Sequence, residues 1–450
     1  MPGPVLFDEV EERIRELVQS ENSLPEDLGD LIAVRDLFGR IRFVLEKRPE
    51  DSFKEKALQK SARKALEDFA KKAKEKLGPR AYPPDQAFLY RGELASDVDS
   101  ELNAAREIDA GPPRLRFLDR QVTGLGWATT PRPEPTKAHR IAFYSLKGGV
   151  GRSTSAAVAA WHLARQGKNV LVLDLDLEAP GLSSSLLPTE QLPDFGIVDW
   201  FVEDAVGQGE VVLKEMVAAS PLAQDLDGQL WVAPSHGRLP GDYLAKLGRC
   251  YLDTPQPDGN GHESWEKRLV RLIKELEVRK GADVVLIDVR AGLADLSSVP
   301  VTDLGADVLL FALDTDQTWE GYKLLFQHWR RTEAVRALRE RLQIVAALVP
   351  ETERAEYLDS FREHAWDLFR DYVYDEVPPN PSESDGELEP FNFDLTDESA
   401  PHAPVPIYWH RGLASLRNLH ALDDQLVSAS FDRFLETIDG LLKAGAEDPT

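Results

Sequence analysis

The feature that most constrains this chain is an apolar run followed by a glycine-rich turn and a stretch of small residues, over positions 141–161. The apolar run is typical of a buried strand, and the alanine-rich stretch after the turn favours a helix. A strand, tight turn and helix in this order direct backbone N–H groups and the positive end of the helix toward one point. The sequence therefore predicts a binding site for a phosphate chain.

Composition narrows the class of protein. A chain of 450 residues is long enough for two or three domains with cores of their own. A net charge of −25 argues against a surface built as a whole for nucleic acid or anionic membrane, although a local basic patch remains possible. The only cysteine, Cys250, excludes an intrachain disulfide and a cysteine-based metal site, and it favours a cytoplasmic location. We expect neither a signal peptide nor a transmembrane helix.

The chain divides into a predicted helical N-terminal domain with its linker, residues 1–137, and a nucleotide-binding domain, residues 138–450. Prolines 131, 133 and 135 mark the boundary. Apolar residues at helical spacing predict helices before residue 80. They fall in two groups, Phe7, Val10, Ile14 and Leu17, then Leu31, Val34, Leu37, Phe38, Ile41 and Val44.

Residues 47–80 form a basic segment in an acidic chain. Twelve Lys or Arg residues face six acids, a net charge of +6. The favoured interpretation is a solvated amphipathic helix that turns Leu58, Ala65, Phe69 and Leu77 inward. The alternative is a contact surface for nucleic acid or for an acidic partner.

From residue 138 onward, short apolar strands alternate with helices. This pattern predicts an α/β fold with a mostly parallel sheet flanked by helices. The predicted strands are 141–145, 170–174, 229–233, 283–288, 307–313 and 343–349, and the predicted helices are 152–166, 264–280, 318–341, 354–370 and 411–443. An acidic loop is expected at 375–406, since 375–401 holds nine acids and no Lys or Arg. The apolar residues of 421–443 favour core or dimer packing over lipid binding, because acids outnumber bases around them.

The glycine-rich turn, Lys147 to Thr154, reads K-G-G-V-G-R-S-T. It resembles the deviant P-loop of the ParA/MinD-like ATPases, which reads K-G-G-x-G-K-[ST]-[ST]. Further segments follow in the order of that family. They are V-L-V-L-D-L-D at 170–176, L-W-V-A-P-S at 230–235, V-V-L-I-D at 284–288 and A-D-V-L-L at 306–310. The resemblance covers roughly 138–350 and none of 1–135, and it implies a P-loop NTPase fold with ATP and Mg²⁺ as cofactors.

The resemblance also implies roles for individual residues. Asp176 would orient the attacking water, and Lys147 would reach across a dimer interface to the partner's nucleotide. Arg152 stands where the family has lysine. Its guanidinium keeps the positive charge and can bind two phosphate oxygens. The implied sets are Lys147, Gly148, Gly149, Val150, Gly151, Arg152, Ser153 and Thr154 for the nucleotide, Ser153, Asp288 and Asp174 for the metal, and Lys147, Asp176 and Arg152 for catalysis.

The favoured function is an ATP-dependent molecular switch. It would dimerise around nucleotide, hydrolyse ATP slowly and signal to a protein partner through the N-terminal helices. Two alternatives stay open, namely a nucleotide-bound scaffold without turnover, because Arg152 replaces lysine, and a DNA-partitioning ATPase that uses 47–80. No membrane partner is expected. Arg290, two residues after Asp288, could sense the γ-phosphate or form a structural ion pair.

Overall fold

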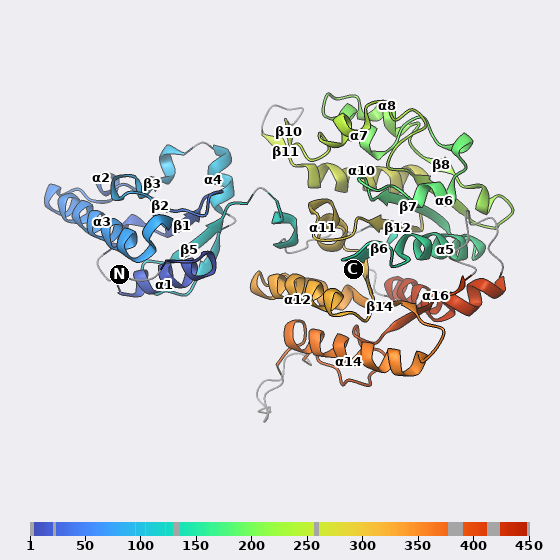
Figure 1. Cartoon of the computed structure of the whole chain (residues 1–450). Coiled ribbons are helices and arrows are strands. Elements are labelled where there is room, and N and C mark those ends of the chain that lie inside the picture. Colours follow the sequence, from blue (N-terminus) through green and yellow to red (C-terminus); the bar gives the residue numbers. More distant parts are fainter. Residues whose placement is uncertain are drawn as a thin grey trace. The chain divides into compact units, whose positions relative to one another are not determined.

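The computed structural model describes residues 4–20, 24–94, 96–103, 105–121, 123–128, 136–255, 261–376, 390–411 and 424–447. The chain forms two compact units, Met1–Thr123 (unit 1) and Gly124–Thr450 (unit 2) (Figure 1). A short 3₁₀ turn, Leu125–Ala128, belongs to unit 2. Its Trp127 is buried there and lies 5.5 Å from the ring of Tyr144 and 6.4 Å from that of Trp329.

Unit 1 is a five-stranded sheet with helices packed on it. The strand order is β3-β2-β1-β5-β4. The strands are Leu31–Arg35 (β1), Ile41–Leu45 (β2), Phe88–Tyr90 (β3), Arg106–Ile108 (β4) and Leu115–Asp119 (β5). The helices are Val10–Ser20 (α1), Pro49–Ser52 (α2), Lys56–Leu77 (α3) and Ser96–Asn103 (α4). Helical structure before residue 80 is thus confirmed for α1 and α3.

The helix predicted across residues 31–44 is wrong, because this stretch forms an antiparallel hairpin of β1 and β2. The turn explains the difference. Asp36 accepts hydrogen bonds from the amides of Phe38 and Arg40, and Gly39 has a φ of 77°. Phe38 is 81% exposed at the tip. Asp and Gly at a tight turn, between two short apolar strands, outweigh a spacing that also fits a helix.

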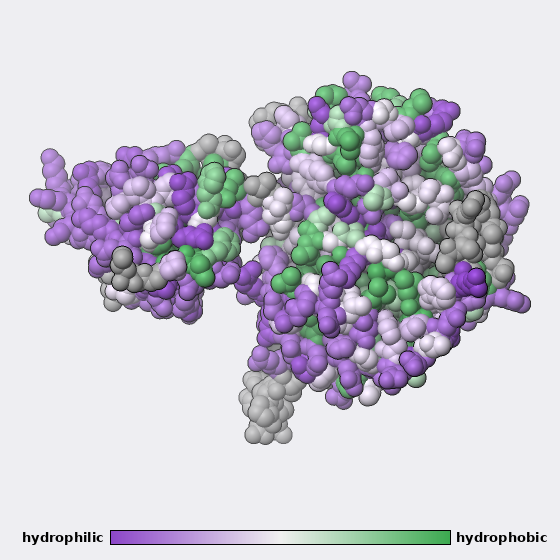
Figure 2. All heavy atoms as spheres, viewed as in Figure 1, coloured by the Kyte–Doolittle hydropathy of each residue, from purple (hydrophilic) through white to green (hydrophobic). Residues whose placement is uncertain are grey.

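Within the basic segment 47–80, residues 56–77 form the predicted amphipathic helix, α3, and its apolar face packs on the sheet. Phe69 and Leu77 are buried, and Ala65 is half-buried. Leu58 is 48% exposed, so its predicted inward position is wrong, and Leu66 lies in the core instead. The surface over α3 is mostly hydrophilic (Figure 2). The nucleic-acid interpretation of this segment stays a prediction.

Unit 2 contains an eight-stranded, mostly parallel sheet in the order β15-β14-β13-β6-β12-β7-β9-β8, with helices on both faces (Figure 1). Its strands are His139–Ser145 (β6), Asn169–Leu175 (β7), Ala218–Ala219 (β8), Gln229–Ala233 (β9), Val284–Val289 (β12), Asp307–Ala312 (β13), Leu342–Val349 (β14) and Val405–Tyr408 (β15). A separate pair of strands, Thr254–Pro255 (β10) and His262–Glu263 (β11), lies outside this sheet. The α/β fold and all six predicted strands are confirmed, whereas β8, β10, β11 and β15 were not predicted.

The helices of unit 2 build one apolar layer on each face of the sheet. One layer holds Ile197–Asp204 (α7), Trp265–Lys280 (α10), Asp295–Thr302 (α11), Asp316–Arg331 (α12) and Arg354–Tyr372 (α14), and the other holds Arg152–Arg165 (α5), Leu182–Leu186 (α6) and Asp424–Glu447 (α16). The remaining short helices are Gly209–Leu213 (α8), Tyr243–Leu247 (α9) and Val335–Leu338 (α13). The helix predicted over 318–341 ends early, where Glu333 adopts a left-handed conformation with φ 60°.

The predicted C-terminal helix is confirmed from Asp424 onward, and 412–423 lie outside the described residues. Phe434 is fully buried, and its ring lies 6.3 Å from that of Phe143 and 6.2 Å from that of Phe311, both in the sheet. The helix is therefore part of the core, which is one of the two kinds of packing, core or dimer, that the sequence favoured. Within the described residues, no helix is long and apolar enough to cross a bilayer.

We expect Phe434→Ala to lower the free energy of unfolding of unit 2 by about 3–5 kcal/mol, because it leaves a cavity between α16 and the sheet. Urea unfolding followed by tryptophan fluorescence measures this change. The matched control is the neighbouring Arg433→Ala, whose side chain is 64% exposed and should cost less than about 1 kcal/mol. Equal effects of the two substitutions would contradict a core position for α16.

Only part of the predicted acidic loop can be compared, since 377–389 lie outside the described residues. Its flanks are packed. Asp375 binds Arg339 at 2.7 Å, and the ring of Phe391 lies 5.8 Å from that of Tyr374. The loop prediction is wrong at its end, because β15 pairs with β14 from Val405.

Candidate nucleotide site

The glycine-rich turn connects the end of β6 to the start of α5, as the motif predicts. Gly149 and Gly151 have φ angles of 77° and 80°, which side-chain-bearing residues adopt only with strain. Residues 147–154, together with Ser145, line a pocket of about 200 Å³. Because α5 begins at Arg152, the first N–H groups of the helix have no acceptor within it and point toward this turn.

The sheet brings two predicted carboxylates to the same edge. β12 pairs with β6 on one side and with β7 on the other, and Asp288 lies directly opposite Asp174 in the β12–β7 register. Both side chains are fully buried. Asp176 follows the end of β7, and its side chain is 15% exposed. In a parallel sheet the carboxyl ends of neighbouring strands meet, so strand ends far apart in sequence converge on the turn.

Arg152 joins these groups. Its Nε donates a hydrogen bond to Asp288 Oδ1 at 2.6 Å, its Nη2 to Asp176 Oδ2 at 3.1 Å and its Nη1 to Ser145 Oγ at 3.1 Å. The residue is only 6% exposed. A planar guanidinium with several N–H donors can satisfy three acceptors at once, which a single ammonium cannot do in the same geometry. Sequence reasoning placed Arg152 on the phosphates and missed both Ser145 and this arrangement.

Burial controls the acidity of the two strand-end carboxylates. Desolvation raises the pKa of Asp288 to about 6, although the Arg152 guanidinium acts in the opposite direction. Desolvation also raises the pKa of Asp174, against the lowering effect of hydrogen bonds from Ser183. The backbone N–H of Ser183 donates to Asp174 Oδ2 at 3.0 Å, and its hydroxyl donates to the same oxygen. Asp174 is thus tied to α6, a contact that the sequence did not predict.

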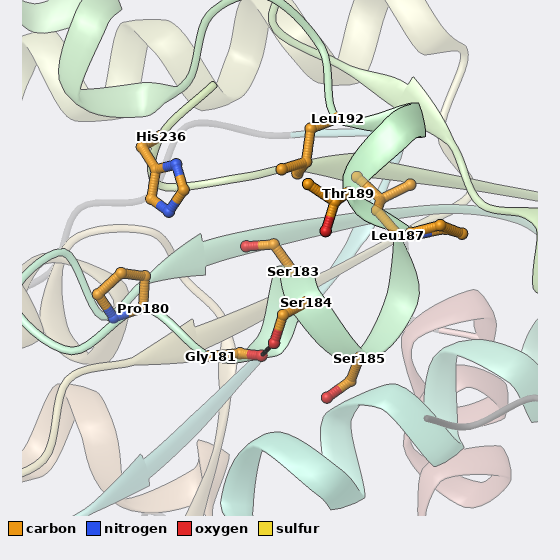
Figure 3. A pocket seen from close by; sticks show the side chains of 10 residues that line it. Pro180, Gly181, Ser183, Ser184, Ser185, Leu187, Thr189, Leu192 and His236 are labelled. Atoms are coloured by element: carbon orange, nitrogen blue, oxygen red, sulfur yellow. Dashed lines mark hydrogen bonds between the residues drawn. The ribbon is translucent and has the colours of Figure 1, made fainter. Parts of the chain in front are cut away.

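A second pocket, of about 290 Å³, lies beside α6. Hydroxyl groups of Ser183, Ser184 and Thr189 border it, and His236, from the loop after β9, lies across from Thr189 (Figure 3). The pocket shares no lining residue with the pocket of the glycine-rich turn. Ser183 connects the two regions through Asp174.

Two further predicted residues point elsewhere. Lys147 is half-buried, and its ammonium donates to the side chain of Gln317 near the start of α12. Arg290 binds Glu178 at 2.8 Å, and Glu178 also accepts from the hydroxyl of Tyr251. Arg290 therefore takes the ion-pair arrangement, one of its two predicted roles.

A directly held Mg²⁺ does not fit the residues as they are arranged. Mg²⁺ prefers carboxylate and hydroxyl oxygens, and one oxygen each of Asp174 and Asp288 is buried without a hydrogen bond. The other oxygen of Asp288, however, already binds the cationic Arg152. In the part of the chain that the structure describes, no three His, Cys, Asp or Glu side chains are grouped to hold a metal ion. The metal set Ser153, Asp288 and Asp174 stays a prediction.

Comparison with known proteins agrees with the motif. The model of the ParA family, described as NUBPL iron-transfer P-loop NTPase, matches residues 136–194. The Fe-S cluster assembly factor HCF101, chloroplastic, of Oryza sativa subsp. japonica is 29% identical over 177 residues. That match covers 36% of this chain and 30% of the relative, so the chain spans about a third of the relative's length.

Solved structures give more distant likenesses. A structure of pNOB8 ParA bound to nonspecific DNA is 15% identical, with a TM-score of 0.43, and covers 70% of this chain and 100% of its own. A plasmid partition protein from Borrelia burgdorferi is 18% identical, with a TM-score of 0.34, and covers 50% of this chain and 86% of its own. Cobyrinic acid a,c-diamide synthase from Mycobacterium smegmatis, with bound ADP and magnesium, is 21% identical, with a TM-score of 0.37. The match covers 54% of this chain and 86% of the synthase chain. These values are too low to transfer a function.

The family match falls on β6, the glycine-rich turn, α5 and β7, which are the elements that build the pocket. Residues 136–194 are therefore a ParA-like P-loop segment, and this segment lies within unit 2.

Proposed function

We propose that unit 2 binds ATP at residues 147–154 and works as a nucleotide-dependent switch. The observation that carries the proposal is the convergence of Asp288, Asp176 and Arg152 beside the glycine-rich turn. These residues are up to 136 positions apart, and they meet where the phosphate chain would lie. Phosphate binding and transfer depend on such positioned charge and on backbone N–H groups more than on covalent chemistry.

The remainder of the proposal concerns assembly. Two copies dimerise around the nucleotide and hydrolyse it slowly, and unit 1 passes the state to a protein partner. Lys147 supports this step, because it lines the pocket while its ammonium is turned toward Gln317 and away from the buried carboxylates. A lysine in this position is available to a second copy once the contact with Gln317 breaks.

Iron transfer, which the description of the matched family model names, is not part of the proposed function. Iron–sulfur clusters are held by several cysteine thiolates. The sequence has one cysteine, Cys250, which is buried, and burial raises its pKa to about 12. A buried protonated thiol is a poor metal ligand.

Nucleotide binding is tested by calorimetry with ADP, ATP and GTP on the whole chain and on Gly151→Val. A β-branched residue at a φ of 80° would distort the turn, so we expect the variant to lose at least about tenfold in affinity. The control is Gly207→Ala, a glycine with a φ of 79° three residues after the end of α7, where a Cβ meets no atom within 4 Å. Absence of heat with every nucleotide and the whole chain would refute the proposed function.

A further inference from the structure

We propose that the guanidinium of Arg152 serves as a built-in cation for Asp288 and Asp176, so that nucleotide binding depends little on a divalent metal. The inference rests on the proposed nucleotide-binding function. It starts from a disagreement, since the fold leads one to expect Mg²⁺ at these carboxylates, yet the guanidinium of Arg152 already binds both of them.

The contacts of Arg152 are those of a fixed group. Its side chain is 7% exposed, that of Asp288 is 1% exposed, and three different nitrogens bind three different acceptors. The third acceptor, Ser145 Oγ, is itself held by a 2.8 Å hydrogen bond to the carbonyl of Lys147. Removing the guanidinium from this position would leave a buried carboxylate without its partner, which is strongly unfavourable.

The charges lead to the same conclusion. Asp174, Asp176 and Asp288 gather at one sheet edge, and the hydrogen bonds of Asp174 come from the neutral Ser183. Among the residues that the structure describes, Arg152 is therefore the cation that directly contacts these carboxylates, through Asp176 and Asp288. A second cation on Asp288 would lie against the guanidinium and be repelled by it. The phosphate chain meanwhile finds its donors in the backbone N–H groups of the turn and at the start of α5.

A lysine at position 152 would behave differently. Its ammonium is a single flexible point charge, which can move to the phosphates and release Asp288 to a metal ion. The rival account for the natural chain is that Arg152 itself moves from Asp288 to the phosphates when nucleotide binds. The two accounts differ in one measurable quantity, the ratio of ADP affinities with and without Mg²⁺.

The experiment is calorimetry of ADP binding to the whole chain, in excess MgCl₂ and in EDTA. ADP avoids turnover during the titration. For the natural chain we expect the two dissociation constants to agree within about threefold, and for Arg152→Lys we expect Mg²⁺ to tighten binding about tenfold or more. Arg165→Lys is the matched control, because Arg165 lies on the same helix with 43% exposure and should leave the ratio unchanged.

Each outcome separates the inference from the proposed function. Tenfold or greater Mg²⁺ dependence of the natural chain overturns the inference and leaves nucleotide binding intact, and this result needs no variant. An Arg152→Lys protein as insensitive to Mg²⁺ as the natural chain overturns it as well, because arginine would then not be the cause. Failure of the natural chain to bind ADP in either buffer overturns both.

Discussion

Replacing Arg152 by alanine is expected to lower the free energy of unfolding of unit 2 by about 3–5 kcal/mol, because it leaves Asp288 buried without its partner. All nine tryptophans follow residue 124, so tryptophan fluorescence during urea unfolding reports on unit 2 alone. Arg165→Ala, on the same helix, breaks an exposed ion pair with Asp424 and should cost less than about 1 kcal/mol.

A double-mutant cycle isolates the interaction energy between Arg152 and Asp288. Arg152→Ala in an Asp288→Asn background should cost clearly less than in the natural chain, because the buried charge is already gone. Equal costs in the two backgrounds would mean that packing of the arginine stem, and not the ion pair, carries the effect.

The loss in Arg152→Ala should also depend on pH. Burial raises the pKa of Asp288 from its ordinary value of 3.8 to about 6, against the lowering effect of Arg152. A carboxyl group whose pKa is higher in the folded state than in the unfolded state stabilises the folded protein when it is protonated in both states. Its contribution to the free energy of unfolding is complete below the unfolded-state pKa and is lost as the pH rises through the folded-state pKa. Without Arg152 the folded-state pKa of Asp288 rises further, so the pH range over which stability falls extends to higher pH. Acidification from about pH 8 to about pH 6 should therefore recover part of the lost stability, more than in the natural chain. A deficit independent of pH would contradict this account.

Lys147→Ala is expected to reduce ATP hydrolysis by about 100-fold or more, if the lysine supplies charge to the nucleotide of a second copy. The stability of unit 2 should hardly change, because the ammonium binds only the polar side chain of Gln317 among the contacts described. Phosphate release measures the rate, and Lys168→Ala, at an exposed position after α5, is the matched control.

Mixing two inactive variants tests whether Lys147 acts across the dimer. In a one-to-one mixture of Lys147→Ala and Asp176→Asn, half of the dimers are mixed, and each has one site with a natural Asp176 and a lysine from the other copy. About a quarter of the natural rate should return. A lysine acting within its own subunit would restore nothing, since no site then holds both residues.

Local patterns account for most of unit 2 and for the position of its site. The apolar run, the glycines and the small residues of 141–161 each favour the element that forms there. The strands β7 and β12 are short apolar runs, with Asp174 and Asp288 next to their last residues. Parallel pairing then brings these ends together without any special contact. For the same reason Asp288 and Asp176 could be predicted to lie near the turn.

Local patterns failed where two elements compete for the same residues. Residues 31–44 fit a helical spacing, but in the fold β1 pairs with β5 as well as with β2, and these pairs recover backbone hydrogen bonds and bury Ile32 and Phe43. The turn at Asp36 and Gly39 favours the hairpin locally, and the pairing of β1 with β5, more than 70 positions away, adds to it. Such a distant partner does not appear in a short window of sequence. β15 was missed for a similar reason, since four residues become a strand only beside β14.

The sequence by itself determined that a phosphate-binding turn lies between a strand and a helix, and which carboxylates end the neighbouring strands. Only the tertiary structure decided where the charged side chains point, with Arg152 on Asp288 and Asp176, Lys147 on Gln317 and Arg290 on Glu178. The physical reason is the range of the forces. Backbone geometry follows from neighbouring residues, whereas a long flexible cation takes whichever buried acceptor the completed fold brings within hydrogen-bonding distance.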